Sequence, residues 1–377
     1  MRLSGIVLIC CVCAAADDDR GEKIERLLQS GEASYLKGDY GAARQSYEQA
    51  WEIAQETEPT DAVRYTVLKK LTAVRSAAGD YADAESYLQQ ALTWRENQFG
   101  PTDPKAIEDL SEVAALCRRM KDFDRALVVL DRVMSLHVRT GGPESLPVAD
   151  VMSRKAAVML DQKKPETAVV MLASAIGLRG KLSGADSPTL LPDLDRMGEV
   201  TLSLRQYDKA EETYRRALVI RERLYGREHA DLIATLDGLA YAYFGEKKYD
   251  DAEPTYQRLL AVWTASAGPT HPMIATVLDK MAGLYADQKK WDQADDAVAR
   301  ANAVRAHFLA LGLAQAAGVK VTAGDMPAAK ALYERALAAM DAANPLFDEL
   351  RAQVEKNLKL FEPPAKARPG KPASRKK

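Results

Sequence analysis

The chain has 377 residues, of which 47% are hydrophobic and 28% are charged, and its formal net charge is −2. This composition is typical of a folded, soluble protein and excludes general disorder. A net charge so close to zero argues against a dedicated nucleic-acid binder, and the length suffices for two or three ordinary domains or for one long repeat array.

Residues 1–16, MRLSGIVLICCVCAAA, have the layout of a secretory signal peptide. A basic start precedes an apolar run that is too short to span a bilayer, which needs about 20 residues. Small side chains at Ala14 and Ala16 suit the cleavage step, so we expect cleavage after Ala16 and export to the periplasm or the medium. Lipoprotein processing at Cys10 or Cys13 is the alternative, although neither cysteine follows a small residue. Cleavage would leave Cys117 as the only cysteine, so no internal disulfide is expected.

A pattern that ends in alanine, usually with an aromatic residue three positions earlier, recurs along the rest of the chain. Successive alanines are separated by 41, 42, 42, 42, 42, 42 and 35 residues; they are Ala43, Ala84, Ala126, Ala168, Ala210, Ala252, Ala294 and Ala329. Further small or apolar residues follow at offsets four and seven, the spacing of one helical face. A second helical pattern precedes each alanine, as in 236–243 and 278–285. Each repeat is therefore predicted to be a pair of helices, with looser packing in the fourth, where Pro165, Gly177 and Gly180 occur.

Glycine recurs every 42 residues between these pairs, at Gly100, Gly142, Gly184, Gly226 and Gly268. A glycine just past a helix end favours the left-handed backbone conformation. Proline at 104, 188 and 272 suits the first turn of the next helix, and the preceding residues Asp103, Ser187 and His271, with His229 in the same column, fall at the N-cap. His271 is thus predicted to cap a helix rather than to bind a metal or act in catalysis. With no HExxH, phosphate-binding loop or similar motif in the chain, we predict no enzymatic activity, metal or cofactor.

The repeat resembles the tetratricopeptide repeat, in the roughly 42-residue version found in kinesin light chains and in many bacterial proteins. The best match runs from Leu236-x-x-Leu239-Ala240-x-x-Tyr243 through Tyr249-x-x-Ala252-Glu253 to Tyr256-x-x-Leu259-Leu260. The resemblance covers about residues 21–340 and implies an all-α, right-handed superhelix of about eight helix pairs over residues 21–343. It implies a protein-interaction scaffold that binds a peptide or protein partner in its concave groove. The alternative is a structural component of the cell envelope that acts through self-assembly or through its basic tail.

The resemblance also implies which side chains line the groove. One groove position carries Asp195, Asp237 and Asp279, and the next carries Arg154, Arg196 and Lys280. Kinesin light chains usually have asparagine at both positions, so a clamp on peptide backbone is in doubt here. Three aspartates at a pitch of about 10 Å are too far apart to share a metal, but they could bind a basic, extended partner. The alternative is a solvated groove in which the aspartates neutralise Arg196 and Lys280.

The C-terminal region is predicted to end the array. Residues 344–361, NPLFDELRAQVEKNLKLF, form a capping helix in which Asn344 is the N-cap; its apolar stripe consists of Phe347, Leu350, Val354, Leu358 and Phe361. Residues 362–377 are rich in proline and lysine, carry six basic residues and one acidic residue, and are predicted to be disordered. Residues 17–361 have a net charge of −8. The tail is therefore predicted either to contact an anionic membrane or envelope polymer or to act only as a solubilising segment.

Overall fold

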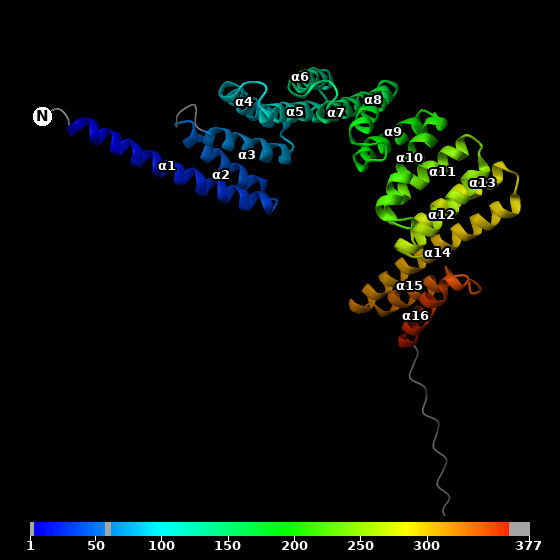
Figure 1. The fold of residues 1–377 in the computed structure, drawn as a ribbon. Helices are drawn as coiled ribbons and strands as arrows, with labels where there is room; N and C mark the ends of the chain where they lie inside the picture. Colours follow the sequence, from blue (N-terminus) through cyan, green and yellow to red (C-terminus); the bar gives the residue numbers. More distant parts are fainter. Residues whose placement is uncertain (1–3, 57–61, 362–377) are drawn as a thin grey trace, which may run out of the picture. The chain divides into compact units, whose positions relative to one another are not determined.

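The computed structural model describes residues 4–56 and 62–361, with side chains from Arg20 onward. All regular structure in these residues is helical, and within each unit consecutive helices pack against each other, from α1 to α8 and from α10 to α16 (Figure 1). The predicted all-α solenoid of helix pairs is confirmed. The chain divides into two compact units, Met1–Asp193 and Leu194–Lys377.

The first unit contains four helix pairs. Its helices are α1 (Ser4–Leu36), α2 (Tyr40–Ala54), α3 (Ala62–Ala78), α4 (Tyr81–Phe99), α5 (Pro104–Arg119), α6 (Phe123–Gly141), α7 (Leu146–Asp161) and α8 (Pro165–Ser183), followed by the 3-10 turn η1 (Pro188–Leu190). The helix α1 is continuous through residues 4–16, which are predicted to be removed by cleavage, and its first described buried side chain is Ile24. Among the described helices, none is both long and apolar enough to cross a membrane.

The second unit continues the pairs and ends in a capping helix. Its elements are α9 (Leu191–Ser203), which begins just before the boundary, α10 (Tyr207–Tyr225), η2 (Ala230–Leu232), α11 (Ile233–Gly245), α12 (Tyr249–Ala267), α13 (Pro272–Asp287), α14 (Trp291–Thr322), α15 (Met326–Ala338), η3 (Pro345–Phe347), α16 (Asp348–Leu358) and η4 (Lys359–Phe361). The side chain of Asn344 accepts a hydrogen bond from Leu346 N, as predicted for the cap. The predicted apolar stripe packs on α14 and α15. The predicted disordered tail, 362–377, lies outside the described residues.

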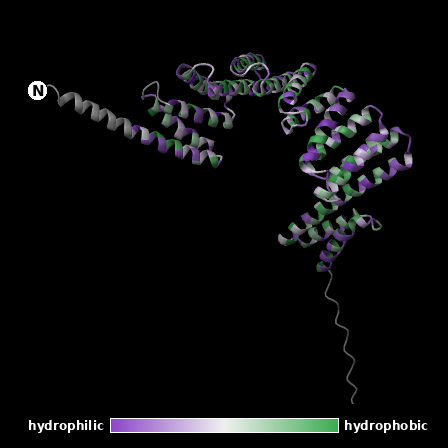
Figure 2. Cartoon of the chain, viewed as in Figure 1, coloured by the Kyte–Doolittle hydropathy of each residue, from purple (hydrophilic) through white to green (hydrophobic). Residues whose placement is uncertain are grey.

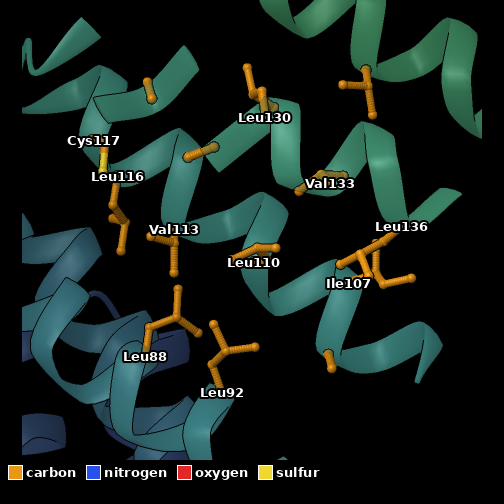
Figure 3. Packing of buried hydrophobic residues seen from close by; sticks show 14 of the residues in the cluster. Leu88, Leu92, Ile107, Leu110, Val113, Leu116, Cys117, Leu130, Val133 and Leu136 are labelled. Atoms are coloured by element: carbon orange, nitrogen blue, oxygen red, sulfur yellow. The ribbon is translucent and has the colours of Figure 1, made fainter. Parts of the chain in front are cut away.

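The alanine column lies in the core of the helix pairs. All eight alanines of the column are buried, and the residues seven positions later have no exposed surface. Figure 3 shows core side chains of the second and third pairs: Leu88 and Leu92 of α4, Leu110 and Val113 of α5 and Leu130 of α6 belong to one core cluster. Apolar and polar residues alternate around the helices, as amphipathic packing requires (Figure 2).

The looser packing predicted for the fourth repeat is not found on its buried face. The helix α8 is continuous, and Ala168, Leu172 and Ala175 have no exposed surface. Gly177 lies on the exposed side of this helix, where a Cβ atom would meet nothing within 4 Å. Because this glycine does not replace a core side chain, it leaves no gap in the core.

The eighth pair differs from the prediction of two separate helices. The helix α14 runs for 32 residues and supplies both the second helix of the seventh pair and the first helix of the eighth. The next position of the glycine column is occupied by Ala310, which is fully buried within α14, and no proline follows it there. Since neither residue that ends a helix is present, the helix continues.

The glycine column ends five helices, as predicted, but in a different conformation. Gly100, Gly142, Gly184, Gly226 and Gly268 have φ between +81° and +98°. Their ψ values lie between 147° and 177°, not near the +47° of the left-handed helix. This region of positive φ and extended ψ is open essentially to glycine alone. Glycine is therefore required at these five positions between helix pairs more strictly than the sequence pattern indicated.

Candidate functional site

The six predicted site residues, which we call the charged row, all lie on first helices of the pairs. Arg154 is on α7 of the first unit, Asp195 and Arg196 are on α9, Asp237 is on α11, and Asp279 and Lys280 are on α13. Because the period is 42 residues, Asp195, Asp237 and Asp279 occupy the same place on three successive first helices. All six side chains are at least partly exposed.

Each aspartate of the charged row is paired with a cation of its own chain. The Arg221 guanidinium on α10 contacts both carboxylate oxygens of Asp195, with N–O distances of 2.7 and 2.5 Å, and also donates to Thr235 Oγ1 at 2.6 Å. Lys280 Nζ lies 2.5 and 2.8 Å from the two carboxylate oxygens of Asp237, and Arg305 on α14 pairs with Asp279. The row therefore presents three ion pairs rather than three bare negative charges.

Two cations of these pairs, Arg221 and Arg305, were missed by the sequence analysis, although they belong to a column of their own. Arg179, Arg221 and Arg305 each lie eleven residues after an alanine of the repeat, on a second helix. His137 and Trp263 occupy the same position in other repeats, and burial lowers the pKa of His137. Applying the 42-residue period to charged positions of the second helices would have revealed this column.

Tyr214 lies between the first helices that carry Asp195 and Asp237. A Cβ atom built on Gly198 or Gly238 would come within 2.5 or 2.3 Å of the Tyr214 ring, so the ring rests on the backbones of α9 and α11. Burial raises the pKa of Tyr214, and the carboxylates of Glu199, Asp195 and Asp237 raise it further. The Tyr214 phenol therefore stays protonated and neutral at physiological pH.

In the first unit, the positions equivalent to Asp195 hold Ser111 and Ser153, and two buried carboxylates that the sequence analysis did not single out, Asp109 and Asp193, lie two residues before this column. Asp109 is 2% exposed, accepts from Tyr65 Oη at 3.0 Å and pairs with Lys69 Nζ at 2.8 Å. Burial by itself would lower the pKa of Lys69, but its hydrogen bonds to Asp109 and Glu112 outweigh burial and raise it. These contacts join α3 to α5 through a structural ion-pair network.

Asp193 is the second buried carboxylate of this unit, at 3% exposure. It accepts from Ser153 Oγ at 2.8 Å and pairs with Arg179 Nη2 at 3.2 Å. Arg179 also contacts Asp150, with an N–O distance of 2.8 Å. Arg154, next to Ser153, is exposed and has no ion pair among the residues that the structure describes, and the same holds for the half-buried Arg196. Two cations of the charged row are therefore available to a partner.

The two histidines of the turn column act as helix caps in the structure. Nδ1 of His271 accepts a hydrogen bond from Met273 N at 3.3 Å, and Nδ1 of His229 accepts from Asp231 N at 3.2 Å. The His271 ring also stacks on Trp263, with the ring centroids 4.8 Å apart. Asp103 and Ser187 cap their helices in the same way, so the predicted capping role of His271 is confirmed.

Metal-binding geometry is not found in the part of the chain with described side chains, where no group of three or more histidine, cysteine, aspartate or glutamate residues is placed to hold an ion. Cys117 is buried and free, and burial raises the pKa of its thiol. The ion pairs of the charged row, and Arg154 and Arg196, which are unpaired among the described residues, can make charged contacts with another molecule.

A model of the tetratricopeptide repeat matches residues 23–97, 64–130, 190–258 and 231–306, which together exceed half of the chain. No protein of curated function matches the chain. Among solved structures, the C-terminal part of a TPR repeat-containing protein from Cytophaga hutchinsonii has 11% identity and a TM-score of 0.53, covering 74% of this chain and 95% of that one.

Two further structures are similar at lower TM-scores. BtubC (BKLC) from P. vanneervenii has 22% identity and a TM-score of 0.48, covering 66% of this chain and 92% of that one. A putative kinesin light chain from Podosopora anserina has 16% identity and a TM-score of 0.46, covering 54% and 97%. At these identities a structural likeness shows the fold alone. Of the three structures, only the one from Cytophaga hutchinsonii, with a TM-score of 0.53, is similar enough to support the fold.

Proposed function

The chain belongs to the tetratricopeptide repeat family, and on that premise we propose that it is an exported scaffold that binds a peptide or protein partner along the residues of the charged row that lie in the second unit. Tetratricopeptide repeat proteins are interaction scaffolds and are generally not enzymes. For this chain we propose the same, with Asp195, Asp237, Asp279, Arg196 and Lys280 as partner-binding residues of the second unit and Arg154 as one of the first.

The observation that carries the proposal is the regular series of exposed ion pairs on α9, α11 and α13. A basic group of the partner has to compete with Arg221, Lys280 or Arg305 for an aspartate. An acidic group of the partner can form an ion pair with Arg196, which has none in the described part of the chain. The Asp237–Lys280 and Asp279–Arg305 pairs are partly exposed and contribute only about 0–1 kcal/mol each, so exchanging their partners costs little, whereas Arg221 is only 12% exposed and holds Asp195 more firmly. We expect an extended partner of mixed charge and binding that weakens with salt.

Affinity capture with crosslinking from the exporting compartment tests this proposal. Replacing Asp195, Asp237 and Asp279 together by Asn should reduce capture of the native partner while the helical content stays unchanged. A matched variant with Asn at Asp83, Asp124 and Asp292, three exposed aspartates in the first turns of second helices, removes the same charge elsewhere. Equal capture by the two variants would reject the charged row as the binding surface.

Export is a separate part of the proposal and rests on residues 1–16. N-terminal sequencing of exported material should begin at Asp17, whereas a retained Met1 contradicts cleavage. A lipid on Cys10 or Cys13 would favour the lipoprotein alternative. The predicted contact of residues 362–377 with an anionic membrane or envelope polymer stays a prediction.

The alternative function, a structural envelope component that self-assembles, is favoured by one observation. Phe308, Leu309 and Val319 on α14 are 56%, 57% and 67% exposed, which is unusual for large apolar side chains in one helix. Light scattering of the exported protein decides between the two functions: a mass that rises with concentration favours self-assembly, and a constant monomer mass favours the scaffold.

A further inference from the structure

Four aromatic side chains form a continuous row at the C-terminal end of α11, which we call the aromatic edge. They are Tyr207 at the start of α10, Tyr241 and Phe244 on α11, and Tyr249 at the start of α12. Successive ring centroids along the row are 6.3, 6.4 and 6.4 Å apart. Tyr241 is 42% exposed, and the other three are half-buried.

The repeat explains two members of this row but not Tyr241. Tyr207 and Tyr249 belong to the aromatic column that precedes the repeat alanines, and Gly245 lets the Tyr207 ring lie directly on α11. The positions equivalent to Tyr241 in the neighbouring repeats are Glu199 and Gly283. A Cβ atom on Gly283 would meet nothing within 4 Å, so no side chain from that position covers this part of α13. An exposed aromatic ring that the core does not require is typical of a contact surface.

Carboxylates border the aromatic edge. A cavity of about 280 Å³ is lined by Asp208, Glu211, Glu212, Glu246, Arg215 and Lys248. Lys248 pairs with Glu211 at 2.5 Å and with Glu246 at 2.9 Å, and Arg215 pairs with Glu211 at 3.2 Å. Asp208 and Glu212 have no ion pair within the described part of the chain, so the lining has an excess of two negative charges.

A further carboxylate lies at the other end of the edge. The Tyr249 hydroxyl donates to Asp287 Oδ2 at 3.3 Å, and Asp287 is exposed. Aromatic faces attract cations, and rows of aromatic rings bind proline-rich segments. The combination of rings with unpaired carboxylates therefore suits a peptide that contains both proline and basic residues.

The chain itself contains such a segment. Residues 362–377, EPPAKARPGKPASRKK, hold four prolines and six basic residues, whereas residues 17–361 have a net charge of −8. The described part of the chain ends at Phe361, whose ring lies 6.3 Å from that of Tyr333 on α15 in the same unit. Four successive helix contacts lead from α15 through α14, α13 and α12 to α11, or at most about 40 Å across the helix axes. Sixteen extended residues reach about 50 Å, so even at this upper limit Pro372 and the basic residues that follow it can contact the edge.

We propose that residues 362–377 bind the aromatic edge, with prolines against the tyrosine rings and basic side chains among Asp208, Glu212 and Asp287. The tail then occupies this surface until a peptide of the same chemistry displaces it. None of these residues belongs to the charged row, so the inference does not depend on what the row binds.

Fluorescence anisotropy with a labelled synthetic peptide of residues 362–377 tests the proposal. The protein is the chain ending at Phe361, which retains every described core residue. We expect a dissociation constant on the order of 10–100 μM that weakens as salt increases. The full-length chain should bind the free peptide at least tenfold more weakly, because its own tail competes at an effective concentration in the millimolar range.

Tyr241→Ala should weaken peptide binding at least tenfold. Tyr225→Ala is the matched control, because Tyr225 is similarly exposed, at 46%, but lies outside the edge against His229. Circular dichroism establishes that both variants remain helical. Equal binding by the two variants, or no binding by the unsubstituted protein, overturns the proposal. Binding of the peptide to phosphatidylserine vesicles but not to the protein also overturns it and assigns the tail to a membrane surface.

Discussion

At the scale of single residues, glycine decides where Tyr214 can lie. The ring reaches the backbones of α9 and α11 because Gly198 and Gly238 have no side chains. Gly283, on the next first helix, faces open space instead. The same residue type therefore has opposite consequences for stability at two positions of neighbouring first helices.

Replacing each of these glycines by alanine separates the two roles. Gly238→Ala should lower the free energy of unfolding by about 1–3 kcal/mol, because the added Cβ overpacks the buried Tyr214 ring. Gly283→Ala should raise it by up to about 1 kcal/mol, because alanine is the better helix former and nothing obstructs its side chain. Urea unfolding followed by circular dichroism measures both. Shifts of the same sign would contradict this account.

At the scale of elements, α14 and α16 determine how the array ends. The uninterrupted α14 supplies one side of the last pair, and α16 covers the apolar side of α14 and α15 that no further repeat would bury. Phe347 is the centre of this contact: it is 1% exposed, and its ring stacks on His307 with centroids 5.9 Å apart. The last repeat is thus protected by packing of the capping helix and not by polar residues of its own.

Phe347→Ala should therefore destabilise the second unit strongly. Removing a fully buried phenylalanine costs about 3–5 kcal/mol, because a cavity remains where the ring was. Leu360→Ala is the control, since Leu360 is 66% exposed and a change there should stay within about 0.5 kcal/mol. Hydrogen exchange of α15 and α16 reports the effect directly. Unaltered protection in Phe347→Ala would show that the capping helix is dispensable.

At the scale of the whole molecule, paired carboxylates and buried phenols set the pH range of stability. A hydrogen bond from Arg95 lowers the pKa of Asp103 below its ordinary 3.8, and one from Lys70 lowers the pKa of Glu32 below 4.5. The unfolded chain therefore binds protons first as the pH falls. The stability that these groups contribute is present above about pH 4 and is lost as the pH falls through the lowered values.

Tyrosines act at the other end of the range. Burial raises the pKa of Tyr214 and Tyr256 above the ordinary 10.0, so the unfolded chain loses these protons first as the pH rises. We expect melting temperatures that are flat between about pH 5 and 9 and fall on both sides. Asp103→Asn should flatten the acid side, and Tyr214→Phe the alkaline side. An unchanged profile in both variants would contradict these assignments.

The period of 42 residues was sufficient to predict which positions are buried, where helices end and why His271 is a cap. These properties depend on spacing along one helix and on the preferences of glycine, proline and capping residues, which are local. The continuous α14 was not predicted, although Ala310 in place of the expected glycine indicates it. Three predictions from such local signals were wrong: the looser fourth repeat, the two separate helices of the eighth pair, and the left-handed helical conformation of the five column glycines.

The neutralisation of an aspartate by Lys280 was one of the predicted alternatives, but the other partners of the charged residues depended on the tertiary structure. Asp195 pairs with Arg221, 26 residues away, and Asp237 with Lys280, 43 residues away, because packing of the helices brings those side chains together. Periodicity places residues on a face but does not say which charge of a neighbouring helix will reach them. For the same reason the aromatic edge, built from three helices, emerged only once the helices were packed. The sequence by itself was enough to determine which residues are buried, because burial depends on spacing along each helix. The ion pairs and the exposed aromatic surface were decided by the tertiary structure, because they depend on contacts between helices.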